Sequence, residues 1–108
     1  MARDIDRRTG EKLKRGQFEI DGRIDLHGMT QDKAQTSLGA FILRSYAANK
    51  RCLLIITGKG EKGRGVLKQR LPEWLNDPEL SGAVLRIVPA TPKDGGSGAF
   101  YVLLRRRR

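Results

Sequence analysis

One short segment of this chain is apolar at every position, and it limits the possible folds more than any other feature. The segment is Cys52-Leu53-Leu54-Ile55-Ile56. Side chains alternate between the two faces of a β-strand, so an unbroken apolar run predicts a strand that is covered on both faces. Interior strands of this kind are typical of α/β proteins, in which helices connect the strands. The core is therefore expected to form around residues 52–56.

Helical and strand-like patterns alternate on both sides of this run. The expected elements are a strand at about 23–27, a helix from Thr30 to near Asn49, the strand 52–56, a helix over 66–75, and strands at 83–88 and 99–104. Pro72 should kink or split the second helix, and the loop from Pro89 to Gly98 should lack regular structure because it is rich in proline and glycine. In so short a chain, the order β-α-β-α-β-β predicts an α/β two-layer sandwich.

The chain has 108 residues and a formal net charge of +10. This length supports one domain with a modest core: a basic N-terminal arm (1–20), a folded domain (21–105) and a basic tail (106–108). A strongly basic chain favours a polyanion as its partner, because binding releases counterions from phosphates. The alternative is that the charge only keeps the protein soluble. The tail is expected to contact phosphates without sequence preference.

Further signals concern the cellular environment. Cys52, the single cysteine, lies in the apolar run, which argues against a disulfide framework and fits a reducing compartment. No apolar stretch has the length needed to span a membrane, and residues 1–8 lack the apolar block of a secretory signal. We therefore expect a cytoplasmic protein without a membrane partner. Nothing indicates an obligate dimer, so a monomer is expected.

The segment Ile24-Asp25-Leu26-His27-Gly28 carries the strongest chemical signal. Alternation places Asp25 and His27 on one face where a strand ends beside a glycine turn, a common position for the chemistry of α/β proteins. His27 is also the only histidine in the chain, so any imidazole-dependent reaction must use it. The pair is predicted to be catalytic. The alternative is a solvated strand face with an incidental histidine.

The glycine-rich segment between the second strand and the second helix is a candidate phosphate-binding loop. Its predicted binding residues are Thr57, Gly58, Lys59, Gly60, Lys62 and Arg64. Glycines expose backbone N–H groups at the start of a helix, and the cations add positive charge. The segment lacks the Lys-Ser/Thr pair of a nucleoside-triphosphate loop, and the next strand lacks the acid of a dinucleotide fold. The alternative is a flexible, merely basic turn.

A second glycine-rich segment precedes the last strand. Gly95, Gly96 and Gly98 are predicted to contact the ligand, although glycines at such positions also serve to allow a positive φ or a bulge. Asp94 is a candidate for supporting a metal or orienting a partner.

Three separated blocks closely resemble, in order and spacing, the signature motifs of the small MutS-related (Smr) domain. They are Ile24–Thr30, Thr57–Gly60 and Gly95–Ala99, and the resemblance covers about Arg23 to Arg105. It implies a mixed four-stranded sheet whose last strand runs antiparallel to the others, in a fold like the C-terminal domain of translation initiation factor three. It also implies action on nucleic acid, either as a DNA-nicking nuclease or as an RNA endonuclease, including work on stalled or collided ribosomes.

The resemblance also assigns residues. The Asp-x-His of the first motif is the pair most often assigned to cleavage, and here it falls on Asp25 and His27. The second motif usually reads His-Gly-x-Gly, but this chain has Thr57 in place of that histidine. No second imidazole is therefore available at that position.

The leading hypothesis is an endonuclease that cleaves phosphodiester bonds, with His27 as general acid or base and Asp25 orienting it or helping to hold a cation. Cleavage of RNA could proceed without metal through the 2′-hydroxyl, whereas DNA would require water and Mg²⁺ or Mn²⁺. The main alternative is a non-catalytic module that binds nucleic acid or the ribosome. A third possibility is a protein-interaction adaptor that uses the arm 1–20.

Overall fold

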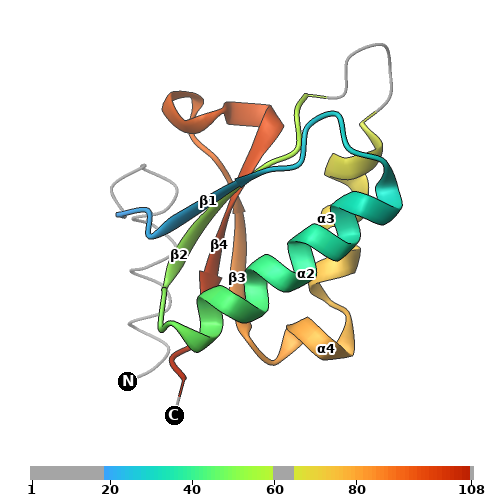
Figure 1. Ribbon diagram of the computed structural model, residues 1–108. Helices are drawn as coiled ribbons and strands as arrows, with labels where there is room; N and C mark the ends of the chain where they lie inside the picture. The colour runs from blue at the N-terminus through green and yellow to red at the C-terminus, as the bar shows by residue number, and fades with distance from the viewer. Residues whose placement is uncertain (1–18, 60–64, 108) are drawn as a thin grey trace.

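The computed structural model describes residues 19–59 and 65–107. Its elements are β1 (Gly22–Asp25), α2 (Gln31–Ala47), β2 (Cys52–Ile56), α3 (Val66–Leu75), α4 (Pro78–Ser81), β3 (Val84–Pro89), the 3-10 turns η2 (Pro92–Asp94) and η3 (Gly96–Gly98), and β4 (Ala99–Leu104). The strands form one sheet in the order β1-β2-β4-β3, and α2, α3 and α4 lie on one face of it (Figure 1). The predicted two-layer α/β sandwich is confirmed.

The strand directions bring the three sequence motifs to one edge of the sheet. β1 and β2 are parallel, whereas β4 is antiparallel to both β2 and β3, so the last strand opposes the others as the resemblance implied. Asp25 pairs with Ile56, and Ile56 pairs with Ala99. The carboxyl ends of β1 and β2 therefore lie beside the amino end of β4. This edge carries the candidate site.

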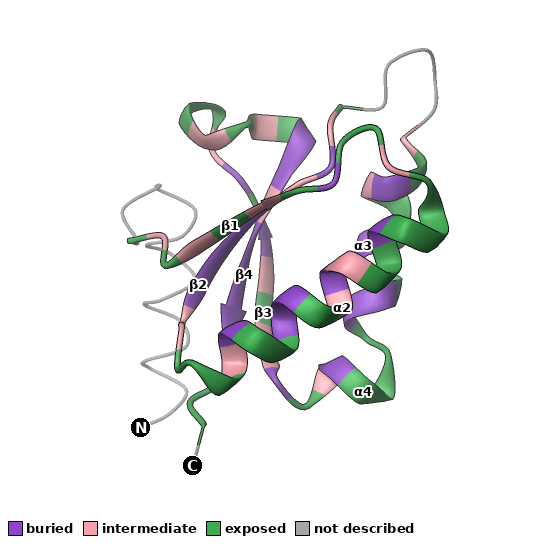
Figure 2. Ribbon diagram, in the orientation of Figure 1, coloured by how far each residue is buried: buried purple, intermediate pink, exposed green. Residues whose placement is uncertain are grey.

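The interior strand β2 contributes side chains to both faces of the sheet, as its unbroken apolar sequence predicted. Most of β2 is buried (Figure 2). Leu53 and Ile55 belong to the core cluster that includes helix residues, and Cys52 and Leu54 belong to a second cluster. The other buried members of the first cluster are Leu26, Ala34, Leu38, Phe41, Ile42, Leu67, Leu71, Trp74, Leu75, Leu80, Ala83, Val102 and Leu104. Burial of Cys52 confirms its prediction as a core residue.

Helix α2 begins and ends where its sequence signals indicated. Thr30 is the N-cap, and its hydroxyl accepts the N–H of Lys33 at 3.2 Å. Asp32 lies in the first turn, where a carboxylate interacts favourably with the helix dipole. Asn49 follows the helix with a φ of 61°, a left-handed conformation that asparagine tolerates well. Helix α2 thus connects β1 to β2, and its N-terminus lies at the edge of the sheet that carries the motifs.

Strand β1 ends earlier in the chain than the sequence pattern predicted. It stops at Asp25, so His27 lies in the following turn rather than on the strand. The N–H of Leu26 still bonds to the carbonyl of Ile56 at 2.7 Å, and its side chain is fully buried. Gly28 then turns the chain with a φ of 83°. The expected alternation survives, because Asp25 and His27 are both exposed while Leu26 is not.

Two other local features differ from what the sequence predicted. Pro72 does not split the second helix, because α3 continues to Leu75 with Pro72 inside it at an exposed position. Proline removes one i→i−4 hydrogen bond, and the burial of Leu71 and Trp74 on the core side holds the remaining turns. The loop after β3 is not irregular either, since it contains η2 and η3.

Within residues 19–59 and 65–107, no helix has the length and hydropathy to cross a bilayer.

Candidate nucleic-acid interface

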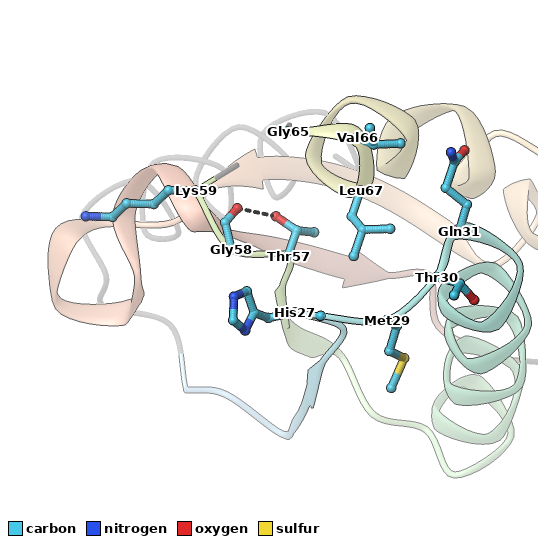
Figure 3. Close-up of a pocket in the computed structure, with 11 residues that line it drawn as sticks. His27, Met29, Thr30, Gln31, Thr57, Gly58, Lys59, Gly65, Val66 and Leu67 are labelled. Atoms are coloured by element: carbon cyan, nitrogen blue, oxygen red, sulfur yellow. Dashed lines mark hydrogen bonds between the residues drawn. The ribbon is translucent and has the colours of Figure 1, made fainter. Parts of the chain in front are cut away.

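A cleft of about 690 Å³ opens at the edge of the sheet where the motifs meet (Figure 3). It is lined by His27, Gly28, Met29, Thr30, Gln31, Thr57, Gly58, Lys59, Gly65, Val66 and Leu67. These residues come from the turn after β1, the start of α2, the loop after β2 and the start of α3. Residues of the first two sequence motifs therefore share one surface.

The imidazole of His27 lies directly against the backbone of Gly58. A Cβ atom added at Gly58 would lie 2.6 Å from Cδ2 of His27, which is too close for any real side chain. Gly58 also has a φ of 84°, a conformation that favours glycine. His27 itself is exposed, so its ring is available to a ligand in the cleft. Glycine at position 58 is what permits this approach.

Asp25 acts on the turn rather than on the imidazole ring. Its Oδ1 accepts the backbone N–H of His27 at 2.9 Å. This is the local side-chain-to-backbone bond that aspartate commonly forms at turns. Asp25 is not among the residues that line the cleft. The structure therefore places the carboxylate where it orients His27 through the main chain.

Thr57 and Gly58 are joined to the third motif by a compact set of hydrogen bonds. The carbonyl of Gly98 accepts the N–H groups of Thr57 and Gly58 at 2.9 and 3.0 Å. The Thr57 hydroxyl is buried and lies 3.1 Å from the carbonyl of Gly58, to which it donates (Figure 3). A Cβ at Gly98 would lie 3.2 Å from the backbone nitrogen of Lys59. Hydrogen bonds and close packing of the third motif thus hold the backbone of the second motif in place.

The remaining glycines of the third motif shape its turn. Gly95 and Gly96 have φ values of 116° and 54°, and neither lines the cleft. Their positive φ is the conformational role that the sequence left open as an alternative to ligand contact. Asp94 accepts a hydrogen bond of 2.5 Å from the buried hydroxyl of Tyr101, which also lies 3.0 Å from the hydroxyl of Thr91. Burial and the bond to Asp94 raise the pKa of Tyr101.

The cleft is electropositive for two reasons. The N-termini of α2 and α3 both border it, and the amino end of a helix carries partial positive charge and free N–H groups. Gly65, the N-cap of α3, supplies no side-chain acceptor, and the first turn of that helix contains no acid. Lys59 adds a full positive charge on an exposed side chain. An anion in the cleft would therefore meet N–H donors, and Lys59 is the one lysine or arginine among the described residues that line it.

Several lining residues were not identified as functional from the sequence. Met29, Gln31, Val66 and Leu67 line the cleft because they begin or precede α2 and α3. The available signal was that the first motif runs directly into the start of α2 and that the glycine-rich segment containing the second motif precedes α3. Gly60, Lys62 and Arg64, which were predicted to bind phosphate, lie outside the described residues.

No group of three or more potential metal ligands is assembled by the part of the chain that the structure describes. In the cleft, the side chain of His27 is the one candidate ligand among the lining residues. The described donors therefore do not form a protein cage for a cation.

Comparison with known proteins finds relatives that carry the Smr name. The Smr domain model matches residues 24–105. The chain is 37% identical over 102 residues to the ribosome rescue factor SmrB of Haemophilus ducreyi, covering 94% of this chain and 54% of that protein. It is 36% identical over 102 residues to SmrB of Vibrio cholerae, covering 94% of this chain and 51% of the relative. The chain thus spans about half the length of the curated relatives it matches.

Solved structures agree in fold. The stand-alone small MutS-related protein YdaL from Escherichia coli superposes with a TM-score of 0.76 at 29% identity, covering 89% of this chain and 73% of that chain. The Smr domain of Thermus thermophilus MutS2 superposes with a TM-score of 0.67 at 28% identity, covering 78% of this chain and 98% of that chain. The sequence motifs, the mixed sheet and the match over residues 24–105 agree, and the chain belongs to the Smr domain family.

Proposed function

We propose that this domain binds the phosphate backbone of RNA in the cleft beside His27, and that its site of action is the ribosome. The observation that carries the proposal is the convergence of two helix N-termini with Lys59 on one exposed cleft. Each helix N-terminus stabilises a bound anion by about 0.3–1 kcal/mol, and a lysine ammonium adds a charge-assisted bond. This is the non-catalytic alternative of the sequence analysis.

The ribosome enters the proposal through the relatives. Proteins that are 36–37% identical to this chain are named ribosome rescue factors, although each is about twice as long. A ribosome presents a dense array of RNA phosphates, and a net charge of +10 favours such a partner. The cleft chemistry and the charge therefore support the same class of target.

A binding experiment tests this function. Wild-type protein is incubated with fluorescent single-stranded RNA and, separately, co-sedimented with 70S ribosomes. Lys59→Gln should weaken both interactions and reduce the slope of log K against log salt by about 0.7, the value for one lost single-strand contact. Arg70→Gln is the matched control, because Arg70 lies on α3 in an exposed ion pair with Glu73 at 3.8 Å and outside the cleft. Equal binding by wild type and Lys59→Gln would reject the cleft as the phosphate site.

A second candidate function is cleavage of RNA at the same site. The observation that favours it is the exposed imidazole of His27 on the rim of a phosphate-binding cleft. In this reaction His27 takes the proton of the 2′-hydroxyl, O2′ attacks phosphorus, and the bond from phosphorus to O5′ breaks. The leaving O5′ takes up a proton from water. Lys59 and the helix N-termini stabilise the charge that builds up on the phosphorane.

RNA suits this reaction because its 2′-hydroxyl supplies the nucleophile. DNA has no 2′-hydroxyl, so its cleavage would need an activated water and a metal ion. A role for Mg²⁺ or Mn²⁺ is tested directly by adding a chelator.

The cleavage test compares three variants with wild type on labelled RNA and DNA, with and without chelator. His27→Ala should reduce cleavage by about 10²–10⁴-fold while leaving RNA affinity nearly unchanged. Asp25→Asn keeps an oxygen that can accept the His27 N–H, whereas Asp25→Ala removes it. Asp25→Asn should therefore retain more activity than Asp25→Ala. If wild type and His27→Ala cut equally, or neither cuts while both bind, the domain is a binding module without this activity.

A further inference from the structure

A second cluster of cations lies at the end of the sheet opposite the cleft. Strand β4 begins at Ala99 beside the cleft and ends at Leu104, where the chain continues directly into arginines (Figure 1). The start of β2 and the last turn of α2 lie at the same end. We call this surface the arginine end, and it consists of Arg44, Lys50, Arg51, Arg105, Arg106 and Arg107.

Two of these guanidinium groups are held in place by main-chain carbonyls. Nε of Arg51 donates to the carbonyl of Leu104 at 3.0 Å, and a terminal nitrogen of Arg107 donates to the carbonyl of Ala47 at 2.7 Å. A guanidinium has five N–H donors, so each retains donors for another acceptor. Arg51, Arg106 and Arg107 line a pocket of about 280 Å³ together with Asn49. Three of the six cations of the arginine end therefore surround a hollow.

The positive charge at this end is not neutralised by the described carboxylates. Among residues 19–59 and 65–107, no cation of the arginine end forms an ion pair. Asp21 is the adjacent acid, and its Oδ2 accepts the backbone N–H groups of Arg51 and Cys52 at 2.8 and 3.1 Å. Five of the six cations are arginines, whose planar forks match the oxygens of a phosphate better than a point charge does.

We propose that the arginine end is a second binding surface for an RNA backbone, so that one strand contacts both the cleft and this surface. The proposal rests on the proposed RNA binding at the cleft and extends it to a substrate of minimum length. The six residues of β4 separate the two surfaces. At about 3.3 Å per residue this distance is roughly 20 Å, or about six stacked nucleotides at 3.4 Å each. A shorter RNA reaches one surface only.

The test compares short and long RNA. Single-stranded oligonucleotides of about 4 and about 16 nucleotides are titrated by fluorescence anisotropy between about 50 and about 200 mM salt. The variant is Arg105→Gln/Arg106→Gln, because both residues are exposed and neither side chain makes a hydrogen bond to the described residues. Its affinity for the long RNA should fall about fivefold per lost contact near 0.1 M salt, with a salt slope lower by about 0.7 per contact. Its affinity for the short RNA should stay at the wild-type value.

Three comparisons keep the two proposals distinguishable. Lys59→Gln should weaken short and long RNA alike, and Arg70→Gln should weaken neither. If the double variant binds long RNA with the wild-type affinity and slope while Lys59→Gln remains impaired, the second surface is rejected and the cleft stands. If wild type has no RNA affinity, both proposals fail. Displacement of long RNA by polyglutamate as effectively as by RNA of equal charge would overturn the assignment to phosphates.

Discussion

The imidazole of His27 packs so closely on Gly58 that a Cβ at position 58 would approach Cδ2 of the ring to 2.6 Å. The two residues follow neighbouring parallel strands, since Asp25 of β1 pairs with Ile56 of β2. Replacement of Gly58 by alanine should therefore displace the ring from its present position in the cleft. It should also destabilise the fold by about 1–3 kcal/mol through overpacking and the positive φ.

Gly28→Ala separates these two contributions. Gly28 has nearly the same φ, 83°, but a Cβ there would meet nothing within 4 Å. Urea unfolding should show that Gly58→Ala is the more destabilising substitution. Equal unfolding free energies for the two variants would mean that His27 does not press against position 58.

Gly98→Ala should loosen the support that the third motif gives to the cleft. A Cβ there would lie 3.1 Å from the backbone carbon of Gly58 and 3.2 Å from the nitrogen of Lys59, so backbone must move. We expect amide chemical shifts of Thr57, Gly58 and Lys59 to change in an NMR spectrum, with weaker RNA binding. Gly82→Ala is the control, because a Cβ at Gly82 has no neighbour within 4 Å. Unchanged shifts at residues 57–59 would contradict this coupling.

Tyr101→Phe should lower the free energy of unfolding by about 1.5–3 kcal/mol. The hydroxyl donates to the Asp94 carboxylate at 2.5 Å in a partly buried setting, and its loss leaves a charged acceptor without that partner. Tyr46→Phe is the matched control, since Tyr46 packs against the core and its hydroxyl has no partner among the described residues. Chemical denaturation measures both variants, and an equal effect would argue against the Asp94 bond as a source of stability.

Stability should fall as pH rises above about 9. Burial, with smaller contributions from the charges of Asp21 and Asp94, raises the pKa of Cys52 to about 12. The pKa of Tyr101 is also raised, first by burial and then by its bond to Asp94. The native state therefore retains protons that the unfolded state releases, so the free energy of unfolding decreases with pH, by at most about 1.4 kcal/mol per pH unit per group.

The alkaline dependence can be measured by urea unfolding at neutral pH and at several pH values above it. Cys52→Ala removes one of the two titrating groups and should flatten the decrease between about pH 9 and 12. A pH profile that is the same with and without Cys52 would contradict the assignment.

Cys52 should react slowly with thiol reagents in the native protein. It is fully buried, and a pKa of about 12 leaves very little thiolate at pH 8. The rate in the native state should be roughly a thousandfold lower than in denaturant, where the thiol returns to its ordinary pKa. A colorimetric thiol assay with and without denaturant checks this, and rapid native labelling would mean that Cys52 is accessible.

Several parts of the fold could be predicted because their signals are local. The bounds of β2 and β4 and the N-cap Thr30 were read directly from apolar runs and capping chemistry. The end of β1 and the continuity of α3 through Pro72 were not. At both places the outcome depends on contacts that a local pattern does not contain: the turn at Gly28 and the packing of Leu71 and Trp74.

The candidate site also has features that the sequence predicted and features that it did not. The sequence by itself predicted Asp25, His27, Gly58 and Lys59, because an acid and an imidazole lie at the end of one predicted strand and a glycine-rich basic loop follows the next. It did not indicate that Asp25 bonds to the main chain of His27 rather than to the ring. It also did not indicate that the starts of α2 and α3 would border one cleft.

The sequence determined the four strands and the two longer helices, and the family to which the chain belongs, but it did not predict α4. Only the tertiary structure decided that β4 is inserted between β2 and β3, which brings Gly98 onto Thr57 across 41 positions of chain and sends the arginines to the opposite end of the sheet. The physical reason is that strand order follows from how all the apolar faces are buried together. Each strand segment, taken alone, could pair with more than one neighbouring strand.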